Sequence, residues 1–266
     1  MADPQVAPQL IVQRDGPIGW LIFSNVAKHN AMTFEMWSGV PEAVAGLAED
    51  PEIRMLVLKG AGDKAFVSGA DISEFETKRG TSEAQMAYNA AADAATAIIQ
   101  TCPKPTLAMV RGYCIGGGLA LALACDLRFA AEGTRFAIPA AKLGLGYRYA
   151  GMRRLVDVVG PSRAKDIFYS ARQFDTAEAL GMGLINRVVS REALEEEVRA
   201  YGARVAANAP LTIAAAKLAI DAATTEPGAD ALGAIDRAIK ACFASEDYRE
   251  GPIAFREKRP PNFKGR

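Results

Sequence analysis

Residues 111–126 read RGYCIGGGLALALACD, a run of three glycines that leads directly into a long apolar stretch. In a P-loop the glycines are followed by Gly-Lys-Ser or Gly-Lys-Thr, whereas this run continues as Leu-Ala-Leu. The spacing G-x-G-x-x-G of a dinucleotide-binding turn is absent as well. The glycines therefore serve something other than these two kinds of nucleotide-binding loop.

Short apolar strands alternate with alanine-rich helices on both sides of this run. Strands are predicted at residues 19–25, 55–60 and 105–112, with strand-like alternation again over 127–139. Helices are predicted at residues 33–50, 82–100 and 116–126, and residues 64–75 read as strand, turn and helix. Regular alternation of this kind predicts an α/β fold.

The pattern becomes mostly helical after about residue 160. We therefore divide the chain into an α/β core over residues 1–195 and a helical C-terminal region over residues 196–266. Two pairs, Asp71 with Glu74 and Asp175 with Glu178, have the spacing of a capping box at a helix start. The loop at residues 76–84 is polar and contains glycine, so we expect it to be mobile near the site.

Composition limits the possible partners. The 266 residues are 50% hydrophobic, which suits one large domain or one domain with an appendage. The 31 Lys and Arg residues balance 31 Asp and Glu residues, so neither nucleic acid nor an anionic membrane is expected as a partner.

The four cysteines have no metal-ligand spacing, and three lie in apolar segments, as is typical of reduced packing residues in a cytosolic protein. The single histidine, His29, is typical of a structural or surface residue, and no metal site is expected. The first residues lack the pattern of a secretory signal, and no apolar run reaches the ~18 residues that span a bilayer. We expect a cytoplasmic protein without membrane contact.

A strand that leads through a glycine turn into a buried helix leaves the first N–H groups of that helix unpaired. Those groups and the helix dipole favour negative charge, and glycine lets a ligand oxygen approach closely. Alone, the three glycines fit a tight helix–strand contact equally well. However, FVSGADI at residues 66–72 is a second strand-to-helix turn with a glycine, and two such turns would form an oxyanion hole.

With these turns the chain resembles the enoyl-CoA hydratase/isomerase (crotonase) family over nearly its whole length. The segments that carry the resemblance are AKHNAM (27–32), FVSGADISEF (66–75), KPTLAMVRGYCIGGGLALALACDLRFA (104–130), FDTAEALGMGLINRVV (174–189) and SEDYREGPIAFREKRPPNFKGR (245–266). The resemblance implies a crotonase-type spiral of strand-strand-helix repeats. It also implies that the helical C-terminal region packs trimers, often paired into hexamers. The alanine-rich helices themselves have apolar faces that need partners, so we expect a trimer or a dimer of trimers.

The resemblance also implies a substrate and a site. It places the carbonyl oxygen of an acyl-CoA thioester between the N–H groups of Ala70 and Gly117. Coenzyme A, as part of the substrate and not as a separate cofactor, would contact Val26, Ala27, Ser68, Ala70, Asp71 and Ile72, with Phe255 and Lys258 near its nucleotide end. Residues 249–266 hold six Lys and Arg against two Glu, which suits phosphates, although a solvated basic tail would have the same composition.

The chain departs from the family at both acids that hydratases use to activate water. One glutamate is expected three residues past the oxyanion glycine and the other after the proline of an F-x-x-P-E segment; Ala120 and Ala140 stand there. Between residues 103 and 155 there are only two acids, Asp126 and Glu132, against eight Lys and Arg. We expect Asp126 to be structural and paired with a nearby arginine. A general base is hard to find here, and a substrate with extra negative charge is easier to accommodate.

The next turn, GLGYRYAG (144–151), has Tyr147 where the family usually has proline. This pattern looks like that of the family's methylmalonyl-CoA decarboxylase branch, which also lacks the glutamates but has a histidine where Ala70 stands here. Decarboxylation needs no base, because loss of carbon dioxide leaves an enolate that an oxyanion hole stabilises. Tyr147 could orient the departing carboxylate or protonate the product carbon; it could also simply line the acyl pocket.

The sequence therefore predicts an acyl-CoA enzyme that stabilises a thioester enolate or oxyanion without the glutamate pair. We expect overall similarity to suggest the name enoyl-CoA hydratase, which says more than these residues support. Decarboxylation or another reaction that needs no base is favoured; hydrolysis, unusual hydration and isomerisation stay open, as does the acyl group. The alternative is a non-catalytic acyl-CoA-binding protein. A purely structural role is disfavoured because both glycine turns are intact.

Overall fold

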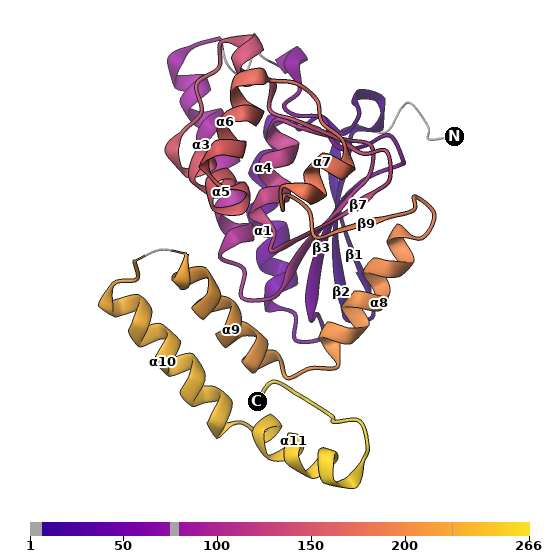
Figure 1. Ribbon diagram of the computed structural model, residues 1–266, viewed down its shortest axis with the longest axis vertical. Helices are drawn as coiled ribbons and strands as arrows, with labels where there is room; N and C mark the ends of the chain where they lie inside the picture. Colours follow the sequence, from indigo (N-terminus) through magenta and orange to yellow (C-terminus); the bar gives the residue numbers. More distant parts are fainter. Residues whose placement is uncertain (1–6, 75–79, 225) are drawn as a thin grey trace.

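The computed structural model describes residues 7–74, 80–224 and 226–266. Within them the strands form a six-stranded sheet in the order β1-β2-β3-β5-β7-β9 and a three-stranded sheet in the order β4-β6-β8 (Figure 1). The strands are β1 Gln9–Asp15, β2 Ile18–Ser24, β3 Met55–Gly60, β4 Ala65–Val67, β5 Thr106–Val110, β6 Tyr113–Ile115, β7 Leu127–Ala131, β8 Arg135–Ala137 and β9 Arg187–Val189.

The helices cover these sheets and extend beyond them. The α-helices are α1 Phe34–Glu49, α3 Ser82–Gln100, α4 Gly117–Ala124, α5 Tyr149–Val159, α6 Pro161–Ser170, α7 Thr176–Gly181, α8 Leu194–Ala206, α9 Pro210–Ala223, α10 Ala229–Ala244 and α11 Glu246–Glu257. The described residues also form the short 3-10 helices η1 Val26–Lys28, η2 Ile72–Glu74 and η3 Pro139–Leu143.

The order of the strands is that of the predicted spiral. Successive strand pairs (β3 with β4, β5 with β6, β7 with β8) each give one strand to the large sheet and one to the small sheet before the chain enters a helix. Only the β1–β2 pair is antiparallel; the other pairs of the described strands are parallel. The α/β class and the strand-strand-helix repeat are confirmed.

Successive side chains along the strands of the large sheet point to opposite faces, and each face packs into its own apolar layer. One face packs on α1, α3 and α4 through side chains such as Leu21 and Leu58, and the other packs on α8 through Trp20 and Val57. Figure 1 shows α1 and α4 on one side of the sheet and α8 on the other. Burial of both faces explains why these parallel strands read as continuous apolar runs.

The buried cysteines belong to this core. Cys102, Cys114 and Cys125 are buried, Cys242 is half-buried, and all four are free thiols. Burial raises the pKa of the Cys114 thiol, and it raises that of Cys125 to about 12. Both therefore stay protonated at neutral pH, as expected of packing residues.

Two details correct the sequence analysis. Residues 187–189 were placed in a mostly helical region, but they form strand β9 at the edge of the sheet beside β7. Residues 113–115, which lie between the predicted strand over 105–112 and the predicted helix over 116–126, form strand β6. The capping interaction at Asp175 is confirmed, since its carboxylate accepts a hydrogen bond from the Glu178 N–H at 3.0 Å. Of the loop predicted to be mobile at residues 76–84, positions 76–79 lie outside the described residues.

Helices α9, α10 and α11 lie below the α/β core in Figure 1. Helix α10 has no buried residue, although it carries Leu232, Ile239 and Phe243 at 51%, 41% and 61% exposure. In the part of the chain that the structure describes, no single helix is long and apolar enough to cross a membrane, and only α8 and α9 together, across a 105° bend, reach that length and composition. The domain boundary at residue 195 stays a prediction.

Candidate active site between two glycine turns

The two glycine turns lie against each other. A Cβ atom added to Gly117 would stand 3.9 Å from the carbonyl carbon of Gly69. At Gly118 an added Cβ would lie 2.0 Å from the carbonyl oxygen of Val67, a distance that no side chain tolerates. Helix α4 can start directly beside the end of β4 only because residue 118 is glycine. Gly118 thus serves tight packing, and that packing brings Gly117 to the second turn.

The backbone at Ala70 is held by a parallel bridge to Met32. The Met32 N–H donates to the Gly69 carbonyl at 2.8 Å, and the Asp71 N–H donates to the Met32 carbonyl at 2.9 Å. Successive peptide groups of an extended chain point in opposite directions, so the Ala70 N–H points away from Met32. Among the described residues, no backbone carbonyl accepts a hydrogen bond from it.

Gly117 is the first residue of α4, where N–H groups have no acceptor within the helix. Its neighbour Gly116 has a φ of 54°, a left-handed conformation that favours glycine, and its N–H donates to the Ala137 carbonyl at 2.9 Å. This turn anchors α4 to β8 and directs the Gly117 N–H out of the helix start. The positive end of the helix dipole adds to the effect.

A buried hydrogen-bond chain joins the two turns. Trp37 Nε1 donates to the Tyr88 hydroxyl at 2.9 Å, and that hydroxyl is 3.2 Å from the Met32 carbonyl, to which it donates. The Trp37 ring lies 3.0 Å from the Cβ position at Gly117. Sequence reasoning did not identify these residues as part of the site. The sequence did offer one signal, a tryptophan and a tyrosine on predicted core helices. The polar atoms of such side chains need hydrogen-bond partners when buried, so these two residues were candidates to pair.

Tyr147 lies beside the same turn. Its hydroxyl oxygen is 3.9 Å from the Cβ position at Gly116, and its ring packs edge-on against Phe168 with centroids 5.4 Å apart. The side chain is half-buried. The next residue, Arg148, pairs with Asp93 at 2.6 Å and donates to the Asn89 carbonyl at 2.7 Å, which ties the start of α5 to α3.

Ala120 and Ala140 both stand close to the glycine turn. The Ala120 N–H donates to the Gly116 carbonyl at 3.1 Å in the first turn of α4. Ala140 is 2% exposed, and its neighbour Pro139 lies 4.0 Å from the Cβ position at Gly116. Neither alanine side chain can accept or donate a proton.

The predicted capping box at Asp71 and Glu74 is wrong. The Asp71 N–H donates to Met32, and the Glu74 carboxylate accepts from the Phe34 N–H at 2.9 Å, across to the start of α1. The Asp71 carboxylate instead accepts from Lys28 at 2.8 Å and from the Ser73 N–H at 3.0 Å. Burial alone would raise the pKa of Asp71, but the hydrogen bonds from Lys28 and Ser73 outweigh it and lower this pKa.

Asp126 is structural, as expected, but its partner is not an arginine. Its carboxylate pairs with Lys217 of α9 at 2.9 Å and accepts from the Thr106 N–H at 2.8 Å. The guanidinium of Arg128 reaches the backbone carbonyl of Asp126, at 3.4 Å, and not its carboxylate. The lysine approaches from a helix that is distant in the sequence.

Most of the residues expected to contact coenzyme A are brought together. Val26 and Ala27 lie in η1, and the Ser68 hydroxyl donates to the Lys28 carbonyl at 3.1 Å, which joins η1 to the Ala70 turn. Ile72, at the start of η2, is 65% exposed. The Ser68 hydrogen bond thus places η1 beside the segment that leads into the Ala70 turn.

Phe255 and Lys258 lie elsewhere. Phe255 is 86% exposed on α11, and Lys258 follows the end of that helix with a φ of 55°. Figure 1 shows α11 at the lower end of the molecule, below the sheet and away from α4. A single chain therefore does not bring these two residues to the glycine turns. Among the described residues there is also no cluster of three His, Cys, Asp or Glu side chains that could hold a metal ion.

Comparison with known proteins places this geometry in a family. The model of the family described as "Enoyl-CoA hydratase/isomerase" matches residues 15–266 of the chain. The chain is 33% identical to a crotonyl-CoA hydratase of Syntrophomonas wolfei over 96% of this chain and 97% of that protein. It is 34% identical to a carnitinyl-CoA dehydratase of Salmonella typhi over 98% of this chain and 100% of that protein.

A solved structure agrees. The crystal structure of an enoyl-CoA hydratase/carnithine racemase from Magnetospirillum magneticum superposes with a TM-score of 0.91 at 35% identity, covering 99% of this chain and 98% of that one. Sequence and fold thus match over nearly the whole chain. The chain belongs to the enoyl-CoA hydratase/isomerase family.

Proposed function

We propose that the protein is an acyl-CoA enzyme that stabilises a thioester enolate between the N–H groups of Ala70 and Gly117. The observation that carries this proposal is the contact between the two turns, each of which presents an N–H without a backbone acceptor among the described residues. Donors fixed in this way stabilise developing negative charge without reorganisation. The names of the relatives, a crotonyl-CoA hydratase and a carnitinyl-CoA dehydratase, support a CoA thioester as substrate.

Decarboxylation of a carboxyacyl-CoA is the reaction that suits these residues best. The bond between the α-carbon and the carboxylate breaks, carbon dioxide leaves, and the electron pair moves onto the thioester as an enolate. The enolate oxygen accepts hydrogen bonds from the two N–H groups, and a proton then adds to the carbon. No step requires the carboxylates that Ala120 and Ala140 lack. Tyr147, beside Gly116, is the group that would orient the carboxylate or supply the proton.

Hydration or dehydration is the second candidate, and the names of the relatives favour it. It requires a base for water, and Glu74, four residues after Ala70, is the candidate, because the nearer Asp71 is paired with Lys28. A screen of the purified protein against crotonyl-, malonyl-, methylmalonyl- and cyclic acyl-CoA thioesters, read by mass spectrometry, separates these reactions. Binding of acetyl-CoA or acetoacetyl-CoA in a calorimeter without turnover of any thioester would establish the non-catalytic alternative, and no binding at millimolar concentration would contradict the proposal.

Replacement of Tyr147 by phenylalanine is expected to slow the reaction found in the screen by at least about tenfold, because general acid catalysis contributes 10²–10⁴-fold. The change removes one hydroxyl and little volume, so kcat should fall while the melting temperature stays unchanged. Tyr149→Phe is the matched control, since Tyr149 is 75% exposed. If Tyr147→Phe has no effect on kcat, Tyr147 only lines the acyl pocket.

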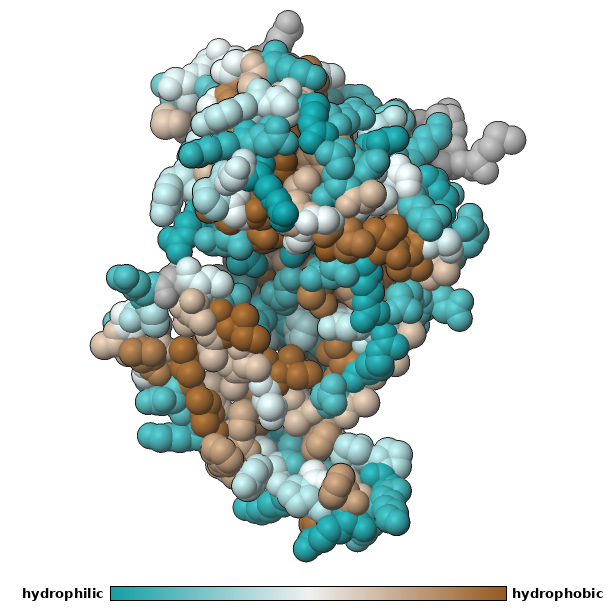
Figure 2. All heavy atoms as spheres, viewed as in Figure 1, coloured by the Kyte–Doolittle hydropathy of each residue, from teal (hydrophilic) through white to brown (hydrophobic). Residues whose placement is uncertain are grey.

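We also propose assembly into a trimer or a dimer of trimers. The exposed apolar side chains of the last three helices support this, and Figure 2 shows them as a brown band over α9 and α10. Assembly would also allow Phe255 and Lys258 of one chain to approach the glycine turns of another. Light scattering should give three or six times the chain mass of 28.2 kDa. A mass near that of one chain would contradict the proposal.

A further inference from the structure

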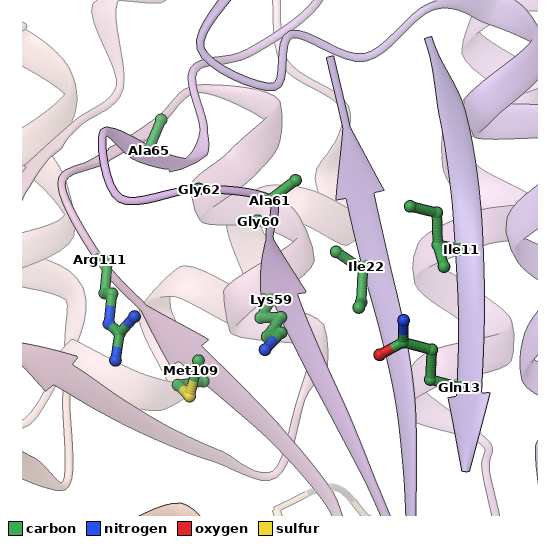
Figure 3. Close-up of a pocket in the computed structure, with 10 residues that line it drawn as sticks. All are labelled: Ile11, Gln13, Ile22, Lys59, Gly60, Ala61, Gly62, Ala65, Met109 and Arg111. Carbon is green, nitrogen blue, oxygen red and sulfur yellow. The ribbon is translucent and has the colours of Figure 1, made fainter. Parts of the chain in front are cut away.

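A cavity of about 310 Å³ opens on the α8 side of the six-stranded sheet (Figure 3). Its floor is a row of register partners: Ile11 pairs with Ile22, Ile22 with Lys59, and Lys59 with Met109. Partners in register point to the same face of a sheet, so these four side chains stand side by side. Arg111 follows at the end of β5, and Figure 3 shows its guanidinium near Met109 and Lys59.

The guanidinium of Arg111 lines one side of the cavity. The Arg111 side chain is 18% exposed, and its Nε atom is shielded from solvent with no hydrogen-bond partner among the described residues. Its terminal nitrogen makes one long contact, 3.4 Å, to Asp63, which is 70% exposed. A buried N–H without an acceptor is unfavourable and rare in native proteins. The terminal N–H groups of Arg111 that Asp63 does not occupy are the donors that could bind a carboxylate in the cavity.

A second cation faces the same space. Lys59 is 19% exposed, lies 3.0 Å from Glu195 of α8, and stands over the Trp20 ring at 4.7 Å. Among the described residues, Lys59 and Arg111 are the charged side chains on the cavity lining, and the carboxylates that contact them are Glu195 and the largely exposed Asp63. A ligand carboxylate in the cavity would therefore meet two cations and no acid on the lining itself.

The remaining walls are apolar. Ile22 and Ile11 line the cavity on one side of Lys59, Met109 lies between Lys59 and Arg111, and the amide of Gln13 stands at the rim. Phosphate or sulfate would use the cations but not this apolar wall. We propose that the cavity binds a short-chain carboxylate, with its carboxylate on Arg111 and Lys59 and its hydrocarbon chain along Ile22 and Ile11. The site is separate from the two glycine turns and does not depend on the reaction proposed there.

Titration with hexanoate tests this site, followed by ligand-observed NMR and by tryptophan fluorescence, because Trp20 borders Lys59. Hexanoate should bind saturably, at least tenfold more tightly than acetate, which lacks the chain, and than hexanamide, which lacks the charge. Binding should weaken as salt is raised. Binding that does not saturate by about 50 mM hexanoate overturns the proposal, because that concentration lies well above the roughly millimolar Kd of a weak specific site. So does inorganic phosphate binding as tightly as hexanoate.

Variants assign the binding to this cavity. Arg111→Gln should weaken hexanoate at least about tenfold, which corresponds to about 1.4 kcal/mol. Gln13→Glu places a negative charge at the exposed rim with almost no change of shape, and it should weaken hexanoate by a similar factor. The matched controls, Arg163→Gln and Gln173→Glu, change exposed residues of other segments and should leave binding unchanged. Full binding by Gln13→Glu and Arg111→Gln would place hexanoate elsewhere and refute the site; if Arg111→Gln does not fold, Gln13→Glu alone decides.

Discussion

Hydration of crotonyl-CoA by the natural protein is expected to be very slow, and the double variant Ala120→Glu, Ala140→Glu is expected to raise it sharply. Water is a poor nucleophile unless a positioned base takes its proton, and each such group contributes roughly 10²–10⁴-fold. The natural chain keeps the two N–H donors, worth about 10²–10³-fold per donor. The rate of hydration, measured by the loss of enoyl absorbance, should therefore rise by two or more orders of magnitude, about the lower contribution of one acid.

The two positions set different demands on the new carboxylates. Ala120 is half-buried in the first turn of α4, whereas Ala140 is 2% exposed in η3. A carboxylate at position 140 loses hydration, which raises its pKa and destabilises the fold. The stability of each variant should therefore be measured by chemical denaturation beside its hydration rate. The single variants Ala120→Glu and Ala140→Glu then show which of the two acids raises the rate. Ala141→Glu adds the same charge at an exposed neighbouring position and should leave hydration slow.

Rapid hydration by the natural protein would contradict the argument from the two alanines. Another acid would then have to activate water, and Glu74 is the first to test. Its carboxylate accepts from the Phe34 N–H at the start of α1, close to the Ala70 turn. Glu74→Gln keeps the shape and removes the basic group, so it should abolish hydration in that case.

The features predicted from the sequence were those that a short stretch determines alone. β3 and α3 were predicted with the bounds the structure shows, since their apolar runs end at turn residues or caps. That the two glycine turns lie close together was expected from the family resemblance. The physical cause of this proximity, the contact of Gly118 with Val67, depends on a backbone 51 positions away (118 − 67) and has no local signal.

The features that could not be predicted depend on long-range pairing. β6 and β9 have three residues each, too few to show a period, and they are strands because neighbouring strands offer them hydrogen bonds. Asp71 has the spacing of a capping box, but the long side chain of Lys28 reaches it across 43 positions. The Trp37–Tyr88 hydrogen bond spans 51 positions. Side-chain chemistry identified groups that need partners but not which partners they find.

Gly118→Ala is expected to destabilise the protein strongly and to slow acyl-CoA turnover by about 10²–10³-fold. The new Cβ would lie 2.0 Å from the Val67 carbonyl oxygen and 2.8 Å from its carbonyl carbon, and both are backbone atoms that no rotamer change can move. Overpacking of a core costs 1–3 kcal/mol and sometimes more, and a backbone contact this short should reach at least about 3 kcal/mol. The midpoint of denaturation should fall with an unchanged slope.

The variant also tests the site, because relief of the contact must move α4 away from β4. Oxyanion donors act only within about 2.7–3.1 Å of the developing charge, so a shift of the Gly117 N–H should cost about 10²–10³-fold in kcat. Gly46→Ala is the matched control: Gly46 lies in α1 with nothing within 4 Å of its added Cβ, and alanine there should stabilise by about 0.5–1 kcal/mol. If Gly118→Ala is as stable and as active as the natural protein, then α4 and β4 are not held in the contact that brings the two N–H groups together, and the oxyanion site proposed here loses its structural basis.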